Sequence, residues 1–589
     1  MTTPKDVPLT PALEPILAGA HVHRPRLLID RRIILISALS IALALLATWV
    51  ALWLTRLIGF FTNLAFYQKL DPSFASPADN HLGLFVVIVP VIGGLLVGLL
   101  ARFGSAAIRG HGIPEAMEQV LTNKSRIPAR VTWLKPLSAA ISIGTGGPFG
   151  AEGPIIASGA ALGSLLGQVL EVSAVERKTL LAAGAAAGMA ATFGSPLSAV
   201  LLAVELLLFE YRPRSLIPVA LAASVASAAR AQLIGSAPVF RTAPLMAATS
   251  SALFAYLVLG LLVGVAAIGV TRACYAVEDR FERLPIHWMW WPALGAIAVG
   301  VVGYFAPHSL GVGYDNIEAI VSGTLVGSAL FRLCLAKFVS WAVALGSGTS
   351  GGTLAPLLTI GGGIGALFGA VVGHAFPASA ISPPMAAVVG MAALFAGASR
   401  APLASLVFAF ETTHQPAALL PLLIGCTASY LVSCLFMRHS IMTEKIERRG
   451  VRAPLEYASD ELVQIGVREV CSTEVVTLAA DETLLHVRQW LSSGAPGTHH
   501  QGFPVLDCER LIGVVTQRDL RRLHESTQCI GALVERPAVC AYDDMSLRDA
   551  VEIMARERIG RLPVVTRRHP LQVIGILTRS DVIEAYARR

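Results

Sequence analysis

The stretch "GTGGPFGAEGP" (residues 144–154) places five glycines and two prolines around a single carboxylate, Glu152. The residues on both sides of it are apolar, as in a membrane segment, and an ionisable side chain at that depth is costly and is typical of a functional site. Glycine lets a bare backbone approach a bound ion, and a proline after the loop starts a helix without wasting an N–H group. The stretch therefore predicts a helix that begins inside the membrane next to a functional carboxylate.

The composition separates a membrane part from a soluble part. Of the 589 residues, 54% are hydrophobic and 14% are charged, whereas a soluble chain carries about 25% charged residues. Apolar runs follow one another from about Arg32 to Tyr430, and the chain becomes charged from Glu444 onward. We expect a multi-pass protein of the cell membrane that contacts the lipid bilayer, followed by a soluble region.

The charged residues set the expected orientation and partners. Four arginines precede the first long apolar run, which places the N-terminus in the cytoplasm by the positive-inside rule; they are Arg24, Arg26, Arg31 and Arg32. We expect the C-terminal region in the cytoplasm as well. The net charge of +7 fits Lys and Arg near anionic lipid. No basic helix or aromatic ladder indicates nucleic acid. Eight cysteines are scattered without a CxxC pair, so we expect no metal site.

The membrane part contains an internal repeat. The stretch 144–154 has a counterpart in "GSGTSGGTLAP" (346–356), and "SPLSAVLLAVE" (195–205) has one in "APLASLVFAFE" (401–411). Both matches are offset by about 200 residues. Repeated halves with broken helices are typical of transporters, whose site lies where the half-helices meet. We therefore expect an all-α membrane domain built of two inverted repeats with broken helices.

Three glycine turns in this domain predict an anion site. "GHGIP" (110–114), "GAEGP" (150–154) and "GTLAP" (352–356) each open an apolar helix. A helix N-terminus carries free N–H groups and roughly half a positive charge, so three converging ends would hold a small anion without a cationic side chain. Glu152 would compete with the anion for this site and act as its gate. The alternative to this gating role is a purely structural one, in which the charge of Glu152 stabilises a helix N-terminus.

The soluble region contains a second repeat and no sign of an enzyme. Residues 503–520 and 562–582 share two short apolar strands and a Gly-x-x-Thr-x-x-Asp motif that leads into a helix, which predicts a pair of α/β modules. An intramembrane metalloprotease would need HExxH, which does not occur, and a magnesium channel would need more membrane carboxylates. The expected domains are a cytoplasmic segment (1–31), a transmembrane domain (32–450), a linker (451–465) and two modules (466–526 and 527–589).

The order of the motifs resembles that of a known family. The chain is similar to the voltage-gated chloride channel (CLC) family of anion channels and proton-coupled exchangers, followed by a pair of cystathionine-β-synthase (CBS) domains. The resemblance spans almost the whole chain, and it rests on "GHGIPEAM", "GAEGP", "FGSPLSAVLLAVE", "KFVSWAVALGSGTSGGTLAPLL", "RAPLASLVFAFE" and "SIMTEKIERRG".

The resemblance implies roles for individual residues and a homodimer with one pore per subunit. Glu152 corresponds to the gating glutamate of the family. The residues implied to line the path of chloride or a similar anion are Gly110, His111 and Gly112 on the inner side, Ala151 and Gly153 on the outer side, Thr353 and Leu354 at the centre, and Met442 at the inner gate. Three of these depart from the family pattern, because His111, Met442 and Leu354 stand where Ser, Tyr and Phe are usual. His111 either lines the anion site or is only tolerated there, and Met442 is either a gate or a packing residue.

The internal proton-path position of the family falls on Glu205 and Leu206. Exchangers carry two consecutive glutamates there, and Leu206 cannot carry a proton. The resemblance therefore favours an uncoupled voltage-gated chloride channel, with a proton-coupled H+/Cl− exchanger as the alternative. Because Glu205 and Glu411 end equivalent stretches of the two repeats, a structural role for both glutamates also remains open.

In the CBS pair, the resemblance implies an adenine-nucleotide site (ATP, ADP or AMP). The Thr would present a hydroxyl to phosphate and the Asp a carboxylate to ribose, at Thr516 and Asp519 in the first module and at Thr578 and Asp581 in the second. The alternative is a pair that binds nothing and only stabilises the dimer.

Overall fold

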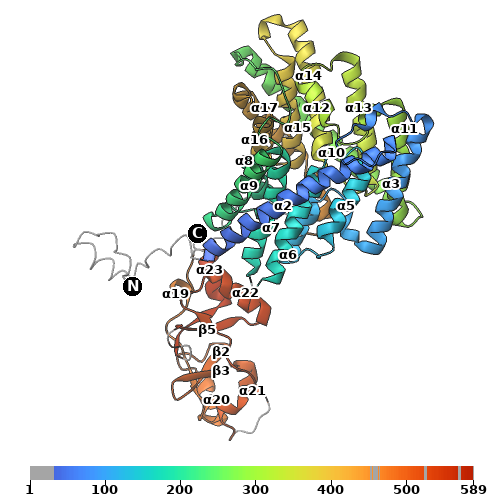
Figure 1. Cartoon of the computed structure of the whole chain (residues 1–589). Helices are drawn as coiled ribbons and strands as arrows, with labels where there is room; N and C mark the ends of the chain where they lie inside the picture. Colours follow the sequence, from blue (N-terminus) through green and yellow to red (C-terminus); the bar gives the residue numbers. More distant parts are fainter. Residues whose placement is uncertain are drawn as a thin grey trace. The chain divides into compact units, whose positions relative to one another are not determined.

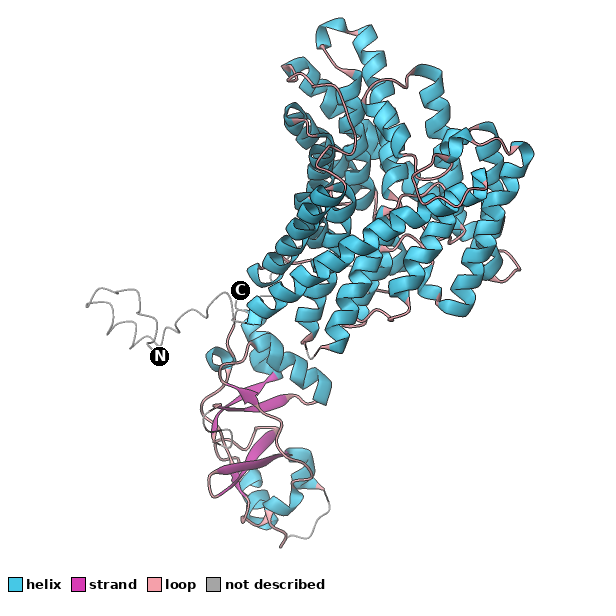
Figure 2. Cartoon of the chain, viewed as in Figure 1, coloured by secondary structure: helices cyan, strands magenta, loops and turns pink. Residues whose placement is uncertain are grey.

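The computed structural model describes residues 32–170, 172–451, 454, 462, 465–522, 527–567, 569 and 572–587. The chain divides into two compact units, Met1–Tyr457 and Ala458–Arg589. Within the described residues the first unit is helical, and all the strands lie in the second (Figures 1 and 2). The expected cytoplasmic segment 1–31, with Arg24, Arg26 and Arg31, lies outside the described residues, as does most of the expected linker 451–465.

The first unit consists of two runs of helices that repeat each other. The first run comprises α2 (Arg32–Thr62), α3 (Ile88–Leu99), α4 (Ile113–Thr122), α5 (Val131–Gly144), α6 (Glu152–Val169), α7 (Ala174–Phe193), α8 (Pro196–Ala203) and α9 (Pro213–Leu233). The second comprises α10 (Ser250–Glu282), α11 (Trp291–Phe305), α12 (Tyr314–Val321), α13 (Gly327–Gly346), α14 (Leu354–Ala375), α15 (Pro383–Ser399), α16 (Pro402–Thr413) and α17 (Leu419–Phe436). The short α18 (Glu444–Arg448) follows.

The packing of the two runs is equivalent, which confirms the repeat. Helix α7 packs against α6, α9 and α2, and helix α15 packs in the same way against α14, α17 and α10. Glycines make the closest contacts in both runs. Gly159 of α6 faces Gly184 of α7, and Gly361 of α14 faces Gly390 of α15. Small residues of this kind let helix backbones approach closely inside a membrane.

The first unit is built to span a membrane several times. Among the described residues, eight helices are long and apolar enough to cross a bilayer. Large apolar side chains remain exposed along them, including Trp49 and Trp53 of α2 and Phe254 of α10. Such exposure is expected for helices that face lipid. Several other helices, such as α4 and α12, are too short to cross a bilayer, as broken helices require.

The second unit contains two small α/β modules with separate cores. The first has the sheet β1 (Leu478–Ala479), β2 (Gly502–Asp507), β3 (Arg510–Thr516) with helices α20 (Leu484–Ser492) and α21 (Gln517–Arg521). The second has the sheet β4 (Ala541–Tyr542), β5 (Arg561–Val565), β6 (Val573–Thr578) with helices α22 (Leu547–Glu557) and α23 (Arg579–Ala587). In each sheet the first pair is parallel and the second antiparallel.

One segment packs with the opposite module from the one that its position in the sequence suggests. Helix α19 (Val467–Val470) falls within the residues assigned to the first module, 466–526. In the structure Val467 lies in the core of the second module, and its N–H donates to the carbonyl oxygen of Met545 at 2.9 Å. The second module therefore includes a segment that precedes the first module in the chain.

Candidate functional site

The three glycine turns meet in the first unit. A bridge pairs Gly150 with Gly352, in which the N–H of Gly352 donates to the carbonyl oxygen of Gly150 at 2.9 Å and the reverse bond measures 3.2 Å. A second bridge pairs Gly110 with Ser350. Because these turns start α4, α6 and α14, the N-terminal ends of three broken helices converge on one place. This is the arrangement that suits a bound anion.

Glycine is required where the turns touch. A Cβ on Gly352 would lie 2.6 Å from the carbonyl oxygen of Gly150 and 2.9 Å from the backbone N of Gly153. A Cβ on Gly153 would overlap the carbonyl oxygen of His111. Gly112 has a φ of +94°, a backbone conformation that glycine adopts without strain. Close approach of the backbones therefore accounts for these glycines.

Glu152 lies at the centre of this arrangement as the first residue of α6. Its side chain is buried, and the residue is 1% exposed. Its Oε1 accepts a hydrogen bond from the hydroxyl of Tyr314 at 2.9 Å. Among the described residues its Oε2 has no hydrogen-bond partner of normal geometry, although the backbone N–H groups of Glu152 itself and of Ala355 face the carboxylate. The carboxylate thus occupies the N-terminal ends of α6 and α14, where an anion would bind.

The other residues predicted to line the anion path are buried in the same unit. Ala151, Thr353 and Leu354 are at most 4% exposed, and Thr353 is the residue before α14. His111 is 3% exposed, and its Nδ1 is buried without a hydrogen-bond partner in the part of the chain that the structure describes. The N–H of Gly112 is not free, because it donates to Oε2 of Glu115 at 2.7 Å. Of the three residues predicted to line the inner side, Gly112 thus has its N–H bonded within its own turn.

Met442 lies in the loop before α18 and is fully buried. The loop is fixed to α15, since the N–H of Ile441 donates to the carbonyl oxygen of Ala398 at 2.9 Å. Lys445 of α18 forms an ion pair with Glu115 of α4 at 2.8 Å, so α18 and α4 are also joined. The segment that carries Met442 is therefore held firmly against the helices around it.

Glu205 and Glu411 cap each other's repeat. Glu205 follows α8, in the short π-helical segment Val204–Leu208. Its carboxylate accepts N–H bonds from Leu403 at 3.1 Å and Ala404 at 2.9 Å, at the start of α16. Glu411 of α16 accepts N–H bonds in the same way from the start of α8. We call these bonds the reciprocal caps. Leu206, the next residue after Glu205, is buried.

Two buried lysines were missed by the sequence analysis, which expected no cationic side chain at the site. Lys135 of α5 donates to the carbonyl oxygens of Ile108 at 2.8 Å and Gly110 at 2.7 Å, directly at the inner glycine turn. Lys337 of α13 occupies the equivalent place in the second repeat. Each lysine lies nine residues before its glycine-rich stretch, at 144 and 346, and this shared spacing is the signal that identifies the pair.

Lys337 supports a fourth turn that the sequence analysis also missed. Its Nζ donates to the carbonyl oxygens of Gly311 at 2.7 Å and Ser309 at 3.2 Å. Gly311 and Gly313 have φ values of +66° and +79°, and Gly110 and Gly112 in the first repeat have +86° and +94°. The turn "GVG" before α12 is therefore the counterpart of "GHG" before α4, and only its two glycines reveal this in the sequence.

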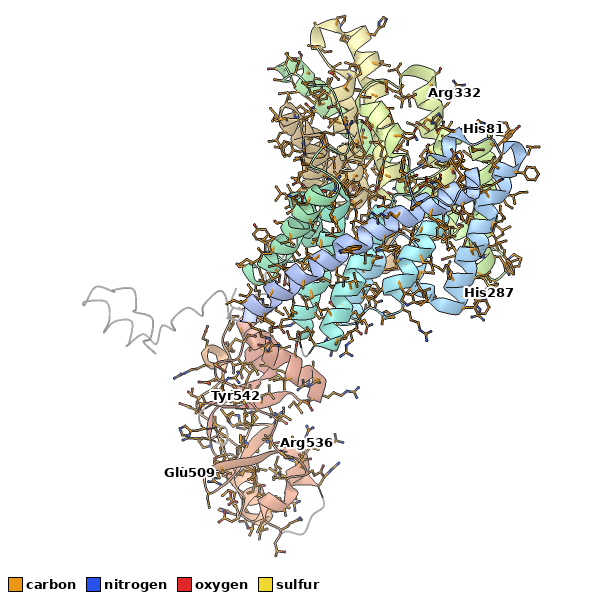
Figure 3. The ribbon with its side chains drawn as sticks, in the orientation of Figure 1. His81, His287, Arg332, Glu509, Arg536 and Tyr542 are labelled. Carbon is orange, nitrogen blue, oxygen red and sulfur yellow. The ribbon has the colours of Figure 1, made fainter. Side chains whose placement is uncertain are left out.

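The predicted Thr–Asp pairs lie at two different cavities among the described residues of the second unit. The larger, of about 1060 Å³, is lined by Thr578 and Asp581, together with Arg561 and Arg579. The smaller, of about 250 Å³, is lined by Thr516 and by Arg561 as well. Arg536, labelled in Figure 3, also lines the smaller cavity.

The two Thr–Asp pairs share the same internal bonds. Thr578 donates through its N–H and its hydroxyl to Oδ2 of Asp581 at 2.7 and 2.8 Å. Thr516 donates to Asp519 in the same way at 3.0 and 2.6 Å. Burial opposes the ionisation of Asp519, but these two bonds, together with the charges of Arg522 and Arg518, outweigh it and lower the pKa of its carboxyl. Each pair therefore closes the first turn of the helix that follows it.

Arg561 is the side chain best suited to an anionic ligand in this unit. Its Nη1 is buried and has no hydrogen-bond partner among the residues that the structure describes, and Arg561 lines both cavities. Burial, and then the like charge of Arg579, lower the pKa of its guanidinium. Two neighbouring guanidinium groups are stabilised when an anion such as a phosphate binds between them.

Models of known protein families match parts of both units. The family model described as "Voltage gated chloride channel" matches residues 93–434, and the CBS domain model matches residues 467–526 and 530–588. The H(+)/Cl(-) exchange transporter ClcA of Salmonella arizonae is 29% identical over 430 residues, which cover 70% of this chain and 89% of that protein. The chloride channel protein CLC-f of Arabidopsis thaliana is 26% identical over 566 residues, which cover 82% of this chain and 70% of that protein.

The same fold occurs in a solved structure. The crystal structure of a slow cyanobacterial Cl-/H+ antiporter superimposes with a TM-score of 0.64 at 24% identity, and the match covers 72% of this chain and 98% of that one. The family model alone spans more than half of the chain. The chain therefore belongs to the voltage-gated chloride channel family of membrane anion transporters, is not an enzyme, and carries a CBS domain pair.

Proposed function

We propose that the chain forms a homodimer in the cell membrane, with both termini in the cytoplasm, and conducts chloride through one pore per subunit gated by Glu152. The observation that carries this proposal is the place of the Glu152 carboxylate. It lies against the N-terminal ends of two broken helices, which would otherwise bind an anion. When the carboxylate is protonated or swings away, the same N–H groups are available to chloride.

The path for protons supports uncoupled conduction. Leu206 stands at the inner proton-path position and has no titratable group. Both oxygens of Glu205 accept backbone N–H bonds from the start of α16, so this carboxylate is engaged in holding two helices together. Neither residue is therefore suited to carry protons to Glu152 from the inner side.

Proton-coupled exchange is the second candidate function. A relative that covers 70% of this chain, ClcA of Salmonella arizonae, is named an H(+)/Cl(-) exchange transporter. His111 is also titratable and lies in the inner glycine turn, where no described residue forms a hydrogen bond with its Nδ1. In an exchanger, this imidazole would carry protons in place of the second glutamate, whose position Leu206 occupies in this chain.

Reconstitution distinguishes the two functions. Purified protein in liposomes loaded with KCl is diluted into low chloride with valinomycin, and chloride efflux and external pH are recorded together. We expect brisk efflux with no net proton movement beyond that of protein-free liposomes. Uphill proton uptake that is driven by the chloride gradient and abolished by a protonophore would instead establish exchange.

For the CBS pair, we propose that an adenine nucleotide binds in the larger cavity and regulates the membrane unit. Its phosphates would lie between Arg561 and Arg579, and its ribose hydroxyls would bond to Asp581. The volume of about 1060 Å³ is large enough for a nucleotide. The observation that favours a phosphate there is the buried Nη1 of Arg561, to which no described residue forms a hydrogen bond.

Asp581→Asn is expected to weaken the binding of ATP, ADP or AMP by roughly tenfold, the loss expected for one hydrogen bond to a charged group. Isothermal calorimetry on the full-length protein in detergent measures this change. Asp519→Asn is a matched control, because Asp519 makes the same internal bonds to its Thr but does not line the larger cavity. If the wild-type protein releases no heat with any of the three nucleotides, the cavity is not a nucleotide site.

A further inference from the structure

The carboxylate of Glu152 accepts a hydrogen bond from a tyrosine that lies 162 residues away in the chain, in the opposite repeat. The hydroxyl of Tyr314 donates to Oε1 at 2.9 Å, and this is the one side-chain hydrogen bond that the described residues offer to the carboxylate. Tyr314 is the first residue of α12 and follows directly after the turn Gly311–Gly313. It is not among the residues that the anion-path motifs include.

The phenol of Tyr314 is held in place from two sides. Its ring packs edge-on against Phe193 at 5.9 Å and against Phe240 at 6.2 Å between ring centroids. Its backbone continues from the turn that Lys337 fixes through bonds to the carbonyl oxygens of Ser309, Gly311 and Val312. A hydroxyl on so rigid a ring has little freedom to follow Glu152 if the carboxylate moves away.

The two repeats differ at this position. Helix α4 begins at Ile113 after Gly112, and helix α12 begins at Tyr314 after Gly313. The first repeat therefore presents an aliphatic side chain where the second presents a hydroxyl. This asymmetry allows the second repeat alone to bond to the carboxylate at the start of α6.

We propose that Tyr314 is a positioning residue that holds the ionised Glu152 carboxylate in the anion site and so keeps the gate closed. The proposal rests on the gating role of Glu152 proposed above. A hydroxyl that donates to a carboxylate stabilises its charged form over its protonated form. The other charged groups that act on this carboxylate or its neighbour are Lys337 of α13 and, through Lys337, Asp315 of α12. Neither Lys337 nor Asp315 donates a hydrogen bond to Glu152. Removing the Tyr314 hydroxyl therefore removes the hydrogen bond and leaves these charges in place.

Tyr314→Phe keeps the ring and removes only the hydroxyl. We expect chloride flux from liposomes to rise at neutral pH, and the external pH of half-maximal flux to move upward by about one unit, since roughly tenfold is lost from the stability of the closed form. Tyr256→Phe is the matched control, because Tyr256 is a buried tyrosine of the same unit and its hydroxyl faces the backbone of Ser382, away from Glu152. It is expected to leave the pH profile unchanged.

Combination with Glu152→Gln separates the two proposals. If Glu152→Gln retains the pH dependence of the wild type, the gating role of Glu152 is wrong, whatever Tyr314 does. If Glu152→Gln removes the pH dependence while Tyr314→Phe matches the wild type, Glu152 is the gate and the role of Tyr314 is wrong. In the double variant, Tyr314→Phe is expected to add nothing to Glu152→Gln, because both act on one bond.

A second variant tests the same bond without changing the tyrosine. Glu152→Asp keeps the charge but draws the carboxylate back by one methylene group, away from the fixed phenol. It is expected to shift the pH of half-maximal flux upward, as Tyr314→Phe does. A Glu152→Asp protein that elutes normally from size exclusion and keeps the wild-type pH profile would overturn the proposal, even if Tyr314→Phe does not fold.

Discussion

Glu152→Gln is expected to raise chloride flux at neutral pH by about tenfold, equivalent to about 1.4 kcal/mol, and to make the flux independent of external pH. Glutamine has nearly the shape of glutamate but carries no charge. It therefore competes poorly with chloride for the N–H groups of α6 and α14 that face the carboxylate. The measurement is chloride efflux from liposomes over a series of external pH values, normalised to the amount of protein incorporated.

The matched control for this change is Glu282→Gln, which removes an exposed carboxylate from the end of α10 in the same unit. It is expected to change neither the flux nor its pH dependence. A flux in Glu152→Gln that still rises and falls with pH as in the wild type would show that a different group controls the pore. The three glycine turns would then remain an anion site without the proposed gate.

Glu205→Ala and Glu411→Ala are each expected to destabilise the membrane unit by about 3 kcal/mol, because each leaves two backbone N–H groups without their charged acceptor. The affected groups lie at the starts of α16 and α8 respectively. The midpoint temperature for loss of the folded protein in detergent, followed by size exclusion after heating, measures the effect. Glu205→Gln and Glu411→Gln, which keep one acceptor oxygen, are expected to lose less.

The two positions serve as controls for each other. A structural role predicts similar losses of stability at Glu205 and Glu411, since the reciprocal caps are equivalent in geometry. If Glu205 instead carries protons, we expect only the Glu205 variant to change proton movement, and we expect its stability to be normal. Unchanged midpoint temperatures in both alanine variants would contradict a stabilising role of the reciprocal caps.

Much of the fold was predictable because local residue types determine it. Glycine and proline at 144–154 and 346–356 indicate where helices must start, and the offset of about 200 residues between equivalent motifs predicts the two repeats. In the second unit, the Pro-Val strand, the following apolar strand and the Thr-x-x-Asp cap correspond to β2, β3 and the start of α21, and then to β5, β6 and the start of α23.

The parts that were not predictable depend on contacts between distant residues. Both glutamates of the reciprocal caps were recognised as equivalent, but their acceptor role depends on N–H groups about 200 residues away. Lys135 and Lys337 look like ordinary interruptions of apolar runs until the structure shows that they bond to the glycine turns. The first repeat has Ile113 at the position equivalent to Tyr314, so a comparison of the two repeats does not identify the tyrosine.

The reciprocal caps also constrain the order of events during synthesis. The N–H groups at the start of α8 lack their carboxylate acceptor until Glu411, 214 residues later in the chain, has been synthesised. At roughly 5–20 residues per second, about 10–40 seconds pass before the ribosome supplies Glu411. The first half of the membrane unit therefore enters the bilayer with one helix end incomplete, and a nascent chain interrupted before this glutamate remains open at that point to chaperones and proteases.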